Sequence, residues 1–175
     1  GEEASRDYGE GICDSMFSCE PDTAKVLILY TDSARILLGG TDAAAIAASA
    51  ARIGEVNMAN DNNSIDHIFL LAKAMPALYT ESGSVSTDIG YMDAENGTYD
   101  TVHFWRDQYY ADFVHLVVGY GGCGIGNLKF DPVDASPTVA FSVSNTSCFL
   151  TNKTFTHELG HNMGLRHDIY ADTSG

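Results

Sequence analysis

A short segment near the C-terminus constrains the fold of this chain more than any other feature. Residues 157–168 read HELGHNMGLRHD, which places three histidines, a glutamate and a glycine at the spacing HExxHxxGxxH. Residues four apart on a helix project from one face, so His157 and His161 can direct two imidazole nitrogens at one ion. His167 can join them only if the helix ends and the chain turns back. Gly164 permits that turn, because glycine adopts positive φ without steric cost.

The residue types in this segment indicate a zinc site with a chemical role. Three neutral imidazoles and one water form the open tetrahedral site that is typical of catalytic zinc. Imidazoles bound to zinc have no lone pair left to accept a proton, so Glu158 is the candidate general base. The remaining histidines lack such partners, and we interpret them as ordinary core or surface residues: His67, His103 and His115.

Apolar runs alternate with helical patterns in the rest of the chain. Strand-like runs are expected at 25–31, 65–74 and 113–118, and a short strand within the loop 76–88. Helices are expected from Thr41, a candidate N-cap, to the Asn/Asp cluster at 60–63, and over 99–110. Because such alternation requires crossover connections, the fold class is predicted to be α/β with a mainly parallel sheet.

The length and the charge limit the domain organisation and the partners. The 175 residues are enough for one domain, which we place at 24–175 after an acidic leader at 1–23. The net charge of −15 would repel nucleic acid, and the apolar runs fall short of the roughly 20 residues that span a bilayer. We therefore expect a monomer without nucleic-acid or membrane partners.

Four cysteines indicate an oxidising compartment, and hence a secreted, extracellular protein. Three pairings are possible for Cys13, Cys19, Cys123 and Cys148. Proximity in the sequence favours Cys13 with Cys19 and Cys123 with Cys148.

Three glycines follow the expected strand 113–118 at the GxGxxG spacing of dinucleotide-binding loops: Gly119, Gly121 and Gly124. A phosphate site also requires a helix that begins directly after the glycines. The residues from Asn127 to Pro137 favour an extended segment and a loop instead, so a nucleotide site is not expected.

The chain resembles the metzincin metallopeptidases, specifically the reprolysin-like branch, in which the extended zinc motif is followed by an aspartate, here Asp168. Upstream segments resemble bacterial secreted peptidyl-Asp metalloendopeptidases: KVLILYT at 25–31, the alanine-rich helix, YTESG at 79–83, CGIG at 123–126 and AFSVSNTSC before the motif. The resemblance covers 24–168 and implies a metzincin-like catalytic domain with a twisted, mainly parallel sheet, one antiparallel edge strand and a zinc-binding active-site helix.

The resemblance also implies roles for residues outside the zinc ligands. The edge strand that receives substrate backbone as an added strand would comprise Gly124, Ile125, Gly126, Asn127 and Leu128. The alternative is an ordinary edge strand without a binding role. Asp168 would support the zinc helix and its turn, or would be a solvated surface residue. Cys13 or Cys19 could also place a thiolate on the zinc as a latency plug, as reprolysin-like precursors do, although the local disulfide is favoured.

The sequence departs from the metzincin pattern after the third histidine. Metzincins place a methionine-bearing turn beneath the zinc, whereas no methionine follows Met163 in this sequence. We therefore expect the C-terminal Met-turn subdomain to be missing, through truncation or by nature.

The leading hypothesis is a secreted zinc-dependent endopeptidase that hydrolyses proteins or peptides through a metal-activated water. One alternative is a noncatalytic secreted zinc-binding module of metzincin fold that binds partners, and another is a domain in which zinc only stabilises the fold. The resemblance implies cleavage beside acidic residues, and Lys153 and Arg166 are the basic residues near the motif. Calcium is a second candidate ion, with Asp131 and Asp134 as candidate ligands.

Overall fold

The computed structural model describes residues 22–128 and 140–167. The strands are β1 (Asp22–Tyr30), β2 (His67–Pro76), β3 (Phe113–Val118), β4 (Gly124–Gly126) and β5 (Phe141–Asn145). The helices are α1 (Asp32–Leu37), α2 (Asp42–Asn62), α3 (Val85–Asp93), α4 (Thr101–Gln108), α5 (Thr146–Thr151) and α6 (Thr154–Asn162).

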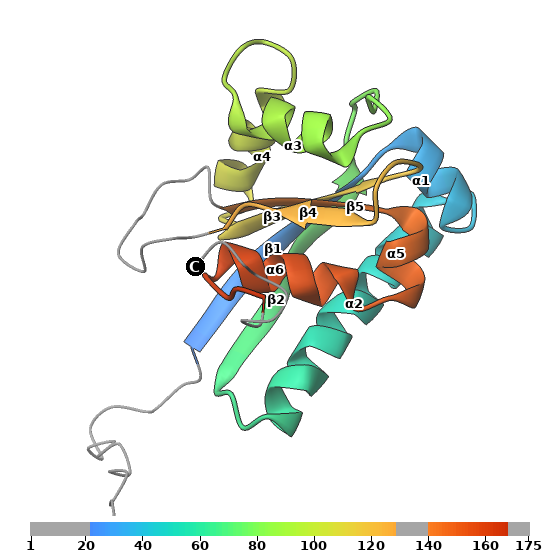
Figure 1. The fold of residues 1–175 in the computed structure, drawn as a ribbon. Coiled ribbons are helices and arrows are strands. Elements are labelled where there is room, and N and C mark those ends of the chain that lie inside the picture. Colours follow the sequence, from blue (N-terminus) through green and yellow to red (C-terminus); the bar gives the residue numbers. More distant parts are fainter. Residues whose placement is uncertain (1–21, 129–139, 168–175) are drawn as a thin grey trace, which may run out of the picture.

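The described strands form one five-stranded sheet in the order β2-β1-β3-β5-β4. Strands β2, β1, β3 and β5 are parallel, and β4 pairs with β5 in the antiparallel direction at the edge of the sheet. Helices cover both faces, with α3 and α4 on one side and α2, α5 and α6 on the other (Figure 1). The predicted α/β fold with a mainly parallel sheet and one antiparallel edge strand is confirmed.

Strand β1 lies inside the sheet, between β2 and β3, and separates two layers of the core. Val26 and Ile28 pack in the layer that includes Phe155 and Leu159 of α6. Leu27 and Leu29, which point to the opposite face of the sheet, pack in the layer of α3 and α4. Successive side chains on a strand point to opposite faces, so a strand buried on both sides is apolar at nearly every position. This explains the continuous apolar run VLILY.

Helix α2 follows the sequence prediction closely. Its N-cap is Thr41, whose side chain accepts a hydrogen bond from the backbone N–H of Ala44, and the helix ends at Asn62 within the predicted Asn/Asp cluster. Strands β1, β2 and β3 and helix α4 also form where they were expected, with boundaries shifted by up to three residues.

The short strand expected within 76–88 is wrong. Helix α3 begins at Val85 instead, and its N-cap Ser84 accepts a hydrogen bond from the backbone N–H of Thr87. Val85, Ile89 and Met92 are buried at a helical spacing on its inner face. Those three positions and the serine cap were the signal for a helix in this segment.

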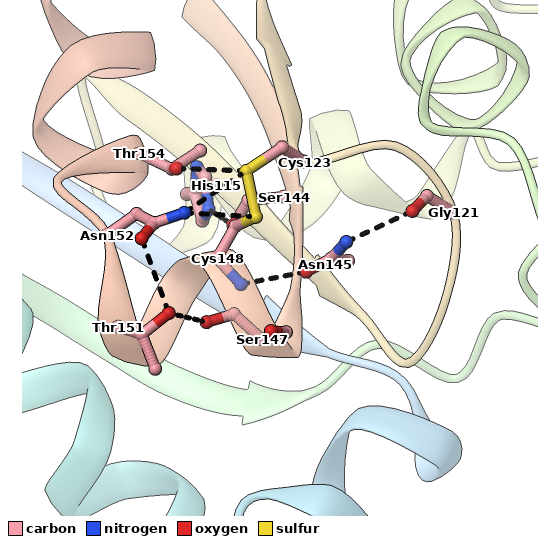
Figure 2. The surroundings of a disulfide bond; sticks show 10 residues. All are labelled: His115, Gly121, Cys123, Ser144, Asn145, Ser147, Cys148, Thr151, Asn152 and Thr154. Atoms are coloured by element: carbon pink, nitrogen blue, oxygen red, sulfur yellow. Dashed lines mark hydrogen bonds between the residues drawn. A yellow bond between two sulfur atoms is a disulfide. The ribbon is translucent and has the colours of Figure 1, made fainter.

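A disulfide joins Cys123, which directly precedes β4, to Cys148 in α5, as predicted from their proximity in the sequence. Figure 2 shows the side chains around it. The Asn152 amide donates to both sulfur atoms, and the Thr154 hydroxyl lies 3.4 Å from Cys123 Sγ. Because Thr154 is the first residue of α6, the disulfide connects the edge strand to both C-terminal helices.

Several predictions lie outside the described residues: residues 1–21 of the leader predicted at 1–23, the pair Cys13 and Cys19, the candidate calcium ligands Asp131 and Asp134, and Asp168. The last two residues of the predicted leader, Asp22 and Thr23, belong to β1. Within the part of the chain that the structure describes, no helix is both long and apolar enough to cross a bilayer.

Candidate metal centre

Helix α6 has one face in the core and presents histidines on the other. Phe155 and Leu159, four residues apart, are each 1% exposed. Burial of both fixes the rotation of the helix about its axis. His157 and His161 lie on the opposite side, where His157 is exposed and His161 is partly exposed.

The helix ends in a tight turn at Gly164, which has a φ of +92°. The Gly164 N–H donates to the carbonyl of His161, and the Leu165 N–H donates to the carbonyl of Gly160, both at 2.9 Å. Glycine is favoured here because other residues are strained at positive φ. The turn redirects the chain so that His167 returns to the histidines of the helix.

The Nε2 atoms of the three histidines converge on one point. They are separated by 3.0 Å between His157 and His167, 3.1 Å between His157 and His161, and 3.2 Å between His161 and His167. Each Nε2 carries either a proton or a lone pair, and a hydrogen bond between two of them needs one of each. Three atoms in a closed triangle cannot alternate in this way, so the three contacts cannot all be hydrogen bonds. Tetrahedral Zn–N bonds of 2.0–2.1 Å require nitrogens about 3.3 Å apart. The arrangement therefore fits a metal ion.

A hydrogen bond on the far side of the His161 ring supports this interpretation. His161 Nδ1 lies 2.7 Å from the carbonyl oxygen of Leu165. A carbonyl oxygen only accepts, so Nδ1 carries the proton and Nε2 of the neutral ring keeps its lone pair. That lone pair faces the other two histidines, and the bond holds the ring in this orientation.

The pKa of His157 lies below its ordinary value because of partial burial, with a further contribution from repulsion by His161 and His167. A lowered pKa favours the neutral imidazole. Because metals bind the neutral form, this shift favours the ligand state of the residue.

Glu158 of α6 is 6% exposed, and its side chain lies against the edge strand β4. Burial raises its pKa to about 6, and this rise is opposed by the nearby His161 imidazole and by a hydrogen bond from the Gly126 backbone. A carboxyl group with a pKa close to neutral is well suited to accept and return a proton. The sequence assigned this residue the role of general base.

Strand β4 lies directly against α6 because two of its residues have no side chain. A Cβ on Gly126 would come within 2.5 Å of the Glu158 carbonyl oxygen. A Cβ on Gly124 would clash with Thr154 and would lie 2.7 Å from Glu158 Oε1. Any larger residue at these positions would push the strand away from the helix.

The structure brings the end of the edge strand to the histidines. A hollow of about 170 Å³ is lined by Gly126, Leu128, His161, Arg166 and His167. Gly126 and Leu128 belong to the segment predicted to receive substrate backbone, and His161 and His167 belong to the candidate metal site. Ile125 pairs with Val143 of β5 and packs against the core layer of α3 and α4.

Sequence analysis did not assign a role to Asn162, which follows His161 in the motif. It is 1% exposed, and its amide donates to the carbonyls of Asn127 and Phe141. An amide at a variable position of a motif gives no signal by itself. Only the spatial pairing of α6 with the edge strand reveals its contacts.

The comparisons with known proteins agree with this geometry. Residues 75–168 match the family described as Metallo-peptidase family M12B Reprolysin-like. The peptidyl-Asp metalloendopeptidase of Stenotrophomonas maltophilia (strain R551-3) is 29% identical over 156 residues, which cover 88% of this chain and 36% of that protein. The protein of the same name from Xanthomonas campestris pv. campestris is 28% identical over 159 residues, which cover 90% of this chain and 36% of that protein.

Among solved structures, a chain from "Structure of a chaperone-substrate complex" matches with a TM-score of 0.70 and 19% identity, over 85% of this chain and 27% of that one. This likeness concerns the fold alone. The present chain spans about a third of the length of the curated relatives that it matches. The family match covers more than half of the chain, so the chain belongs to the reprolysin-like M12B metallopeptidase family.

Proposed function

We propose that this chain contains the catalytic centre of a secreted zinc endopeptidase. The observation that carries the proposal is the convergence of three Nε2 atoms, 3.0–3.2 Å apart, beside a buried glutamate. His157, His161 and His167 would hold the ion. Zinc bound there would act as a Lewis acid and lower the pKa of its water to about 7. A site closed by four protein ligands would have no position for that water.

Glu158 would move the proton in this reaction. Its carboxylate would take a proton from the attacking water and then give it to the leaving amine of the cleaved peptide. Burial against β4 supports this role because it raises the pKa toward neutrality and keeps the carboxylate in one place. Histidines engaged as ligands could not perform the transfer.

The edge strand would position the substrate. The Cys123 carbonyl accepts from the Asn145 N–H, and the Asn127 N–H donates to the Phe141 carbonyl, so these backbone groups face β5. Alternation directs the backbone groups of Gly124 and Gly126 away from β5, where the Gly126 backbone already donates one hydrogen bond to Glu158. A peptide in extended conformation could pair with that side as an added strand. The hollow at Gly126 and Leu128 would then receive a substrate side chain next to the histidines.

The relatives named above suggest the substrate class. They are named peptidyl-Asp metalloendopeptidases, and we propose that this chain also cleaves beside aspartate. Arg166 lines the hollow with His161 and His167, so a basic side chain lies where an acidic one would bind. The Cys123–Cys148 disulfide supports secretion, since disulfides persist in oxidising compartments.

The test is hydrolysis of an unfolded, aspartate-containing protein by the zinc-loaded chain and by a longer natural form that includes it. Cleavage should stop on chelation and return with zinc, and Glu158→Gln should retain zinc without cleaving. Zinc binding without cleavage by either form would favour the noncatalytic module instead. Absence of zinc binding would contradict the assignment of the site.

A further inference from the structure

The side-chain amide of Asn162 joins three parts of the candidate site. Its Nδ2 donates to the carbonyl oxygen of Asn127 at 2.9 Å and to that of Phe141 at 2.8 Å. Asn127 directly follows β4, and Phe141 is the first residue of β5. Both protons of one amide on α6 are therefore used to hold the ends of two adjacent strands.

The hydrogen bonds continue to the opposite side of the sheet. Asn127 Nδ2 donates to the carboxylate of Asp93 at 2.6 Å, and the Asn127 N–H donates to the Phe141 carbonyl at 3.1 Å. Asp93 is the last residue of α3, which covers the other face of the sheet from α6 (Figure 1). Asn127 is thus held from both faces of the sheet, by Asn162 of α6 on one face and by Asp93 of α3 on the other.

Strand β4 needs such restraint because the sheet alone holds it weakly. It has three residues, and among the described strands it pairs with β5 alone. The disulfide at Cys123 fixes the end where β4 begins. The close contacts of Gly124 and Gly126 with Glu158 limit how closely the strand approaches α6, and the hydrogen bond from the Gly126 backbone to Glu158 is one restraint against its moving away. Asn162 opposes that movement at the end where β4 leads into the hollow beside His161.

We propose that Asn162 is a positioning residue that sets the separation between the edge strand 124–128 and helix α6, and with it the depth at which substrate backbone lies over the histidines. This inference rests on the proposed function only for its effect on substrate. Asn162 does not touch the metal site through its own polar atoms. Its effect should therefore fall on peptide binding more than on zinc.

The experiment compares Asn162→Leu, which keeps a similar volume without donors, with Asn162→Asp, which presents oxygen to two carbonyls. The matched control is Asn57→Leu, because Asn57 on α2 also makes two hydrogen bonds, both with Phe69 of β2, the strand at the opposite edge of the sheet from β4. Each zinc-loaded variant is examined by hydrogen–deuterium exchange over 124–128, by zinc content, and by KM and kcat on a peptide spanning the cleavage point.

Both Asn162 variants should exchange amide protons at 124–128 at least about 10-fold faster, as the loss of two hydrogen bonds implies. Their KM should rise about 10-fold while kcat changes by less than about 3-fold and zinc content stays the same. The Asn57 control should show none of these changes. If Asn162→Leu does not fold, Asp93→Ala should cause a smaller change in the same direction.

Unchanged exchange at 124–128 in a folded Asn162 variant would overturn the proposal, as would a loss of zinc or of kcat at constant KM. If the unmodified chain cleaves no peptide, the proposed function fails, and the exchange measurement alone still decides whether Asn162 positions the edge strand.

Discussion

Helix α6 has one histidine, His115, packed on its inner side and the three histidines of the candidate metal site on its outer side, and the two differ in almost every physical respect. On its inner side, Phe155 packs edge-on against the ring of His115, with centroids 4.9 Å apart. Two residues later, His157 points outward to His161 and His167. His115 is 0% exposed, and each of its ring nitrogens has a hydroxyl partner, Ser142 at 2.8 Å and Ser144 at 2.7 Å.

The difference shows that the direction of the ring nitrogens, and not the residue type, determines what a histidine can do. His115 has both nitrogens satisfied and no nitrogen left for an ion, and burial lowers its pKa to about 3, so it is a neutral core residue. His157, His161 and His167, in contrast, direct their Nε2 atoms at one another. Changes at His115 should alter stability, and changes at the three outer histidines should alter metal binding and activity.

The largest effect is expected from His161→Ala. The chain should bind about one zinc, and the variant almost none under the same conditions, because two imidazoles and water are a poor site for the ion. Hydrolysis should be lost with the metal, while the unfolding free energy of the metal-free chain should change little. Metal analysis after dialysis and urea unfolding measure the two quantities. A variant that keeps its zinc would disprove the ligand assignment.

Glu158→Gln separates metal binding from chemistry at the same site. Glutamine keeps the shape but cannot accept the proton, so hydrolysis should fall about 10²- to 10⁴-fold with zinc content unchanged. Initial rates on one unfolded substrate, normalised to bound zinc, give the comparison. Turnover equal to that of the parent would mean that another group activates the water.

Removing the disulfide tests whether the core side of α6 is independent of the metal side. Its sulfur atoms lie near His115 and Ser144 (Figure 2), and it links residues 25 apart in the sequence. Cys123→Ser with Cys148→Ser should lower the unfolding free energy by about 3 kcal/mol. At low urea the variant should still bind zinc. Equal stability of parent and variant, measured by urea titration, would show that the bond restrains little.

Acid sensitivity provides the smallest and most specific contrast. The pKa of His115 in the folded chain is lowered to about 3, below the value near 6.5 expected when unfolded. Its contribution to stability is therefore complete above pH 6.5 and is lost as the pH falls toward 3, by about 2 kcal/mol at pH 5. His115→Gln should remove that part of the pH dependence in urea titrations of the metal-free chain. His167→Gln should retain it, and identical pH profiles for all three chains would contradict the assignment.

The metal site could be predicted from the sequence because its geometry is local. His157 and His161 share a helix face by their spacing, and the turn at Gly164 needs only one residue with positive φ. Helix α2 was predictable for a similar reason, since its cap and its Asn/Asp terminus lie within the segment itself. The antiparallel edge strand was expected from the family resemblance, and β4 confirms it.

The contacts that depend on strand register could not be predicted. His115 meets its two serines because β3 and β5 pair in parallel with His115 opposite Ser142, and nothing in either segment alone specifies that pairing. Asn162 and Asn127 are 35 residues apart in the sequence. Helix α3 was missed for a different reason, because the glycine- and serine-rich residues before it indicated a loop and concealed the cap at Ser84.

The most direct test of the central claim, that the three histidines form an open metal site, is X-ray absorption at the zinc edge of the zinc-loaded chain. The account predicts three imidazole nitrogens and one water oxygen at about 2.0–2.1 Å, with no sulfur ligand. Four protein ligands, or a sulfur at about 2.3 Å, would contradict it, because such a closed site has no position for a reacting water.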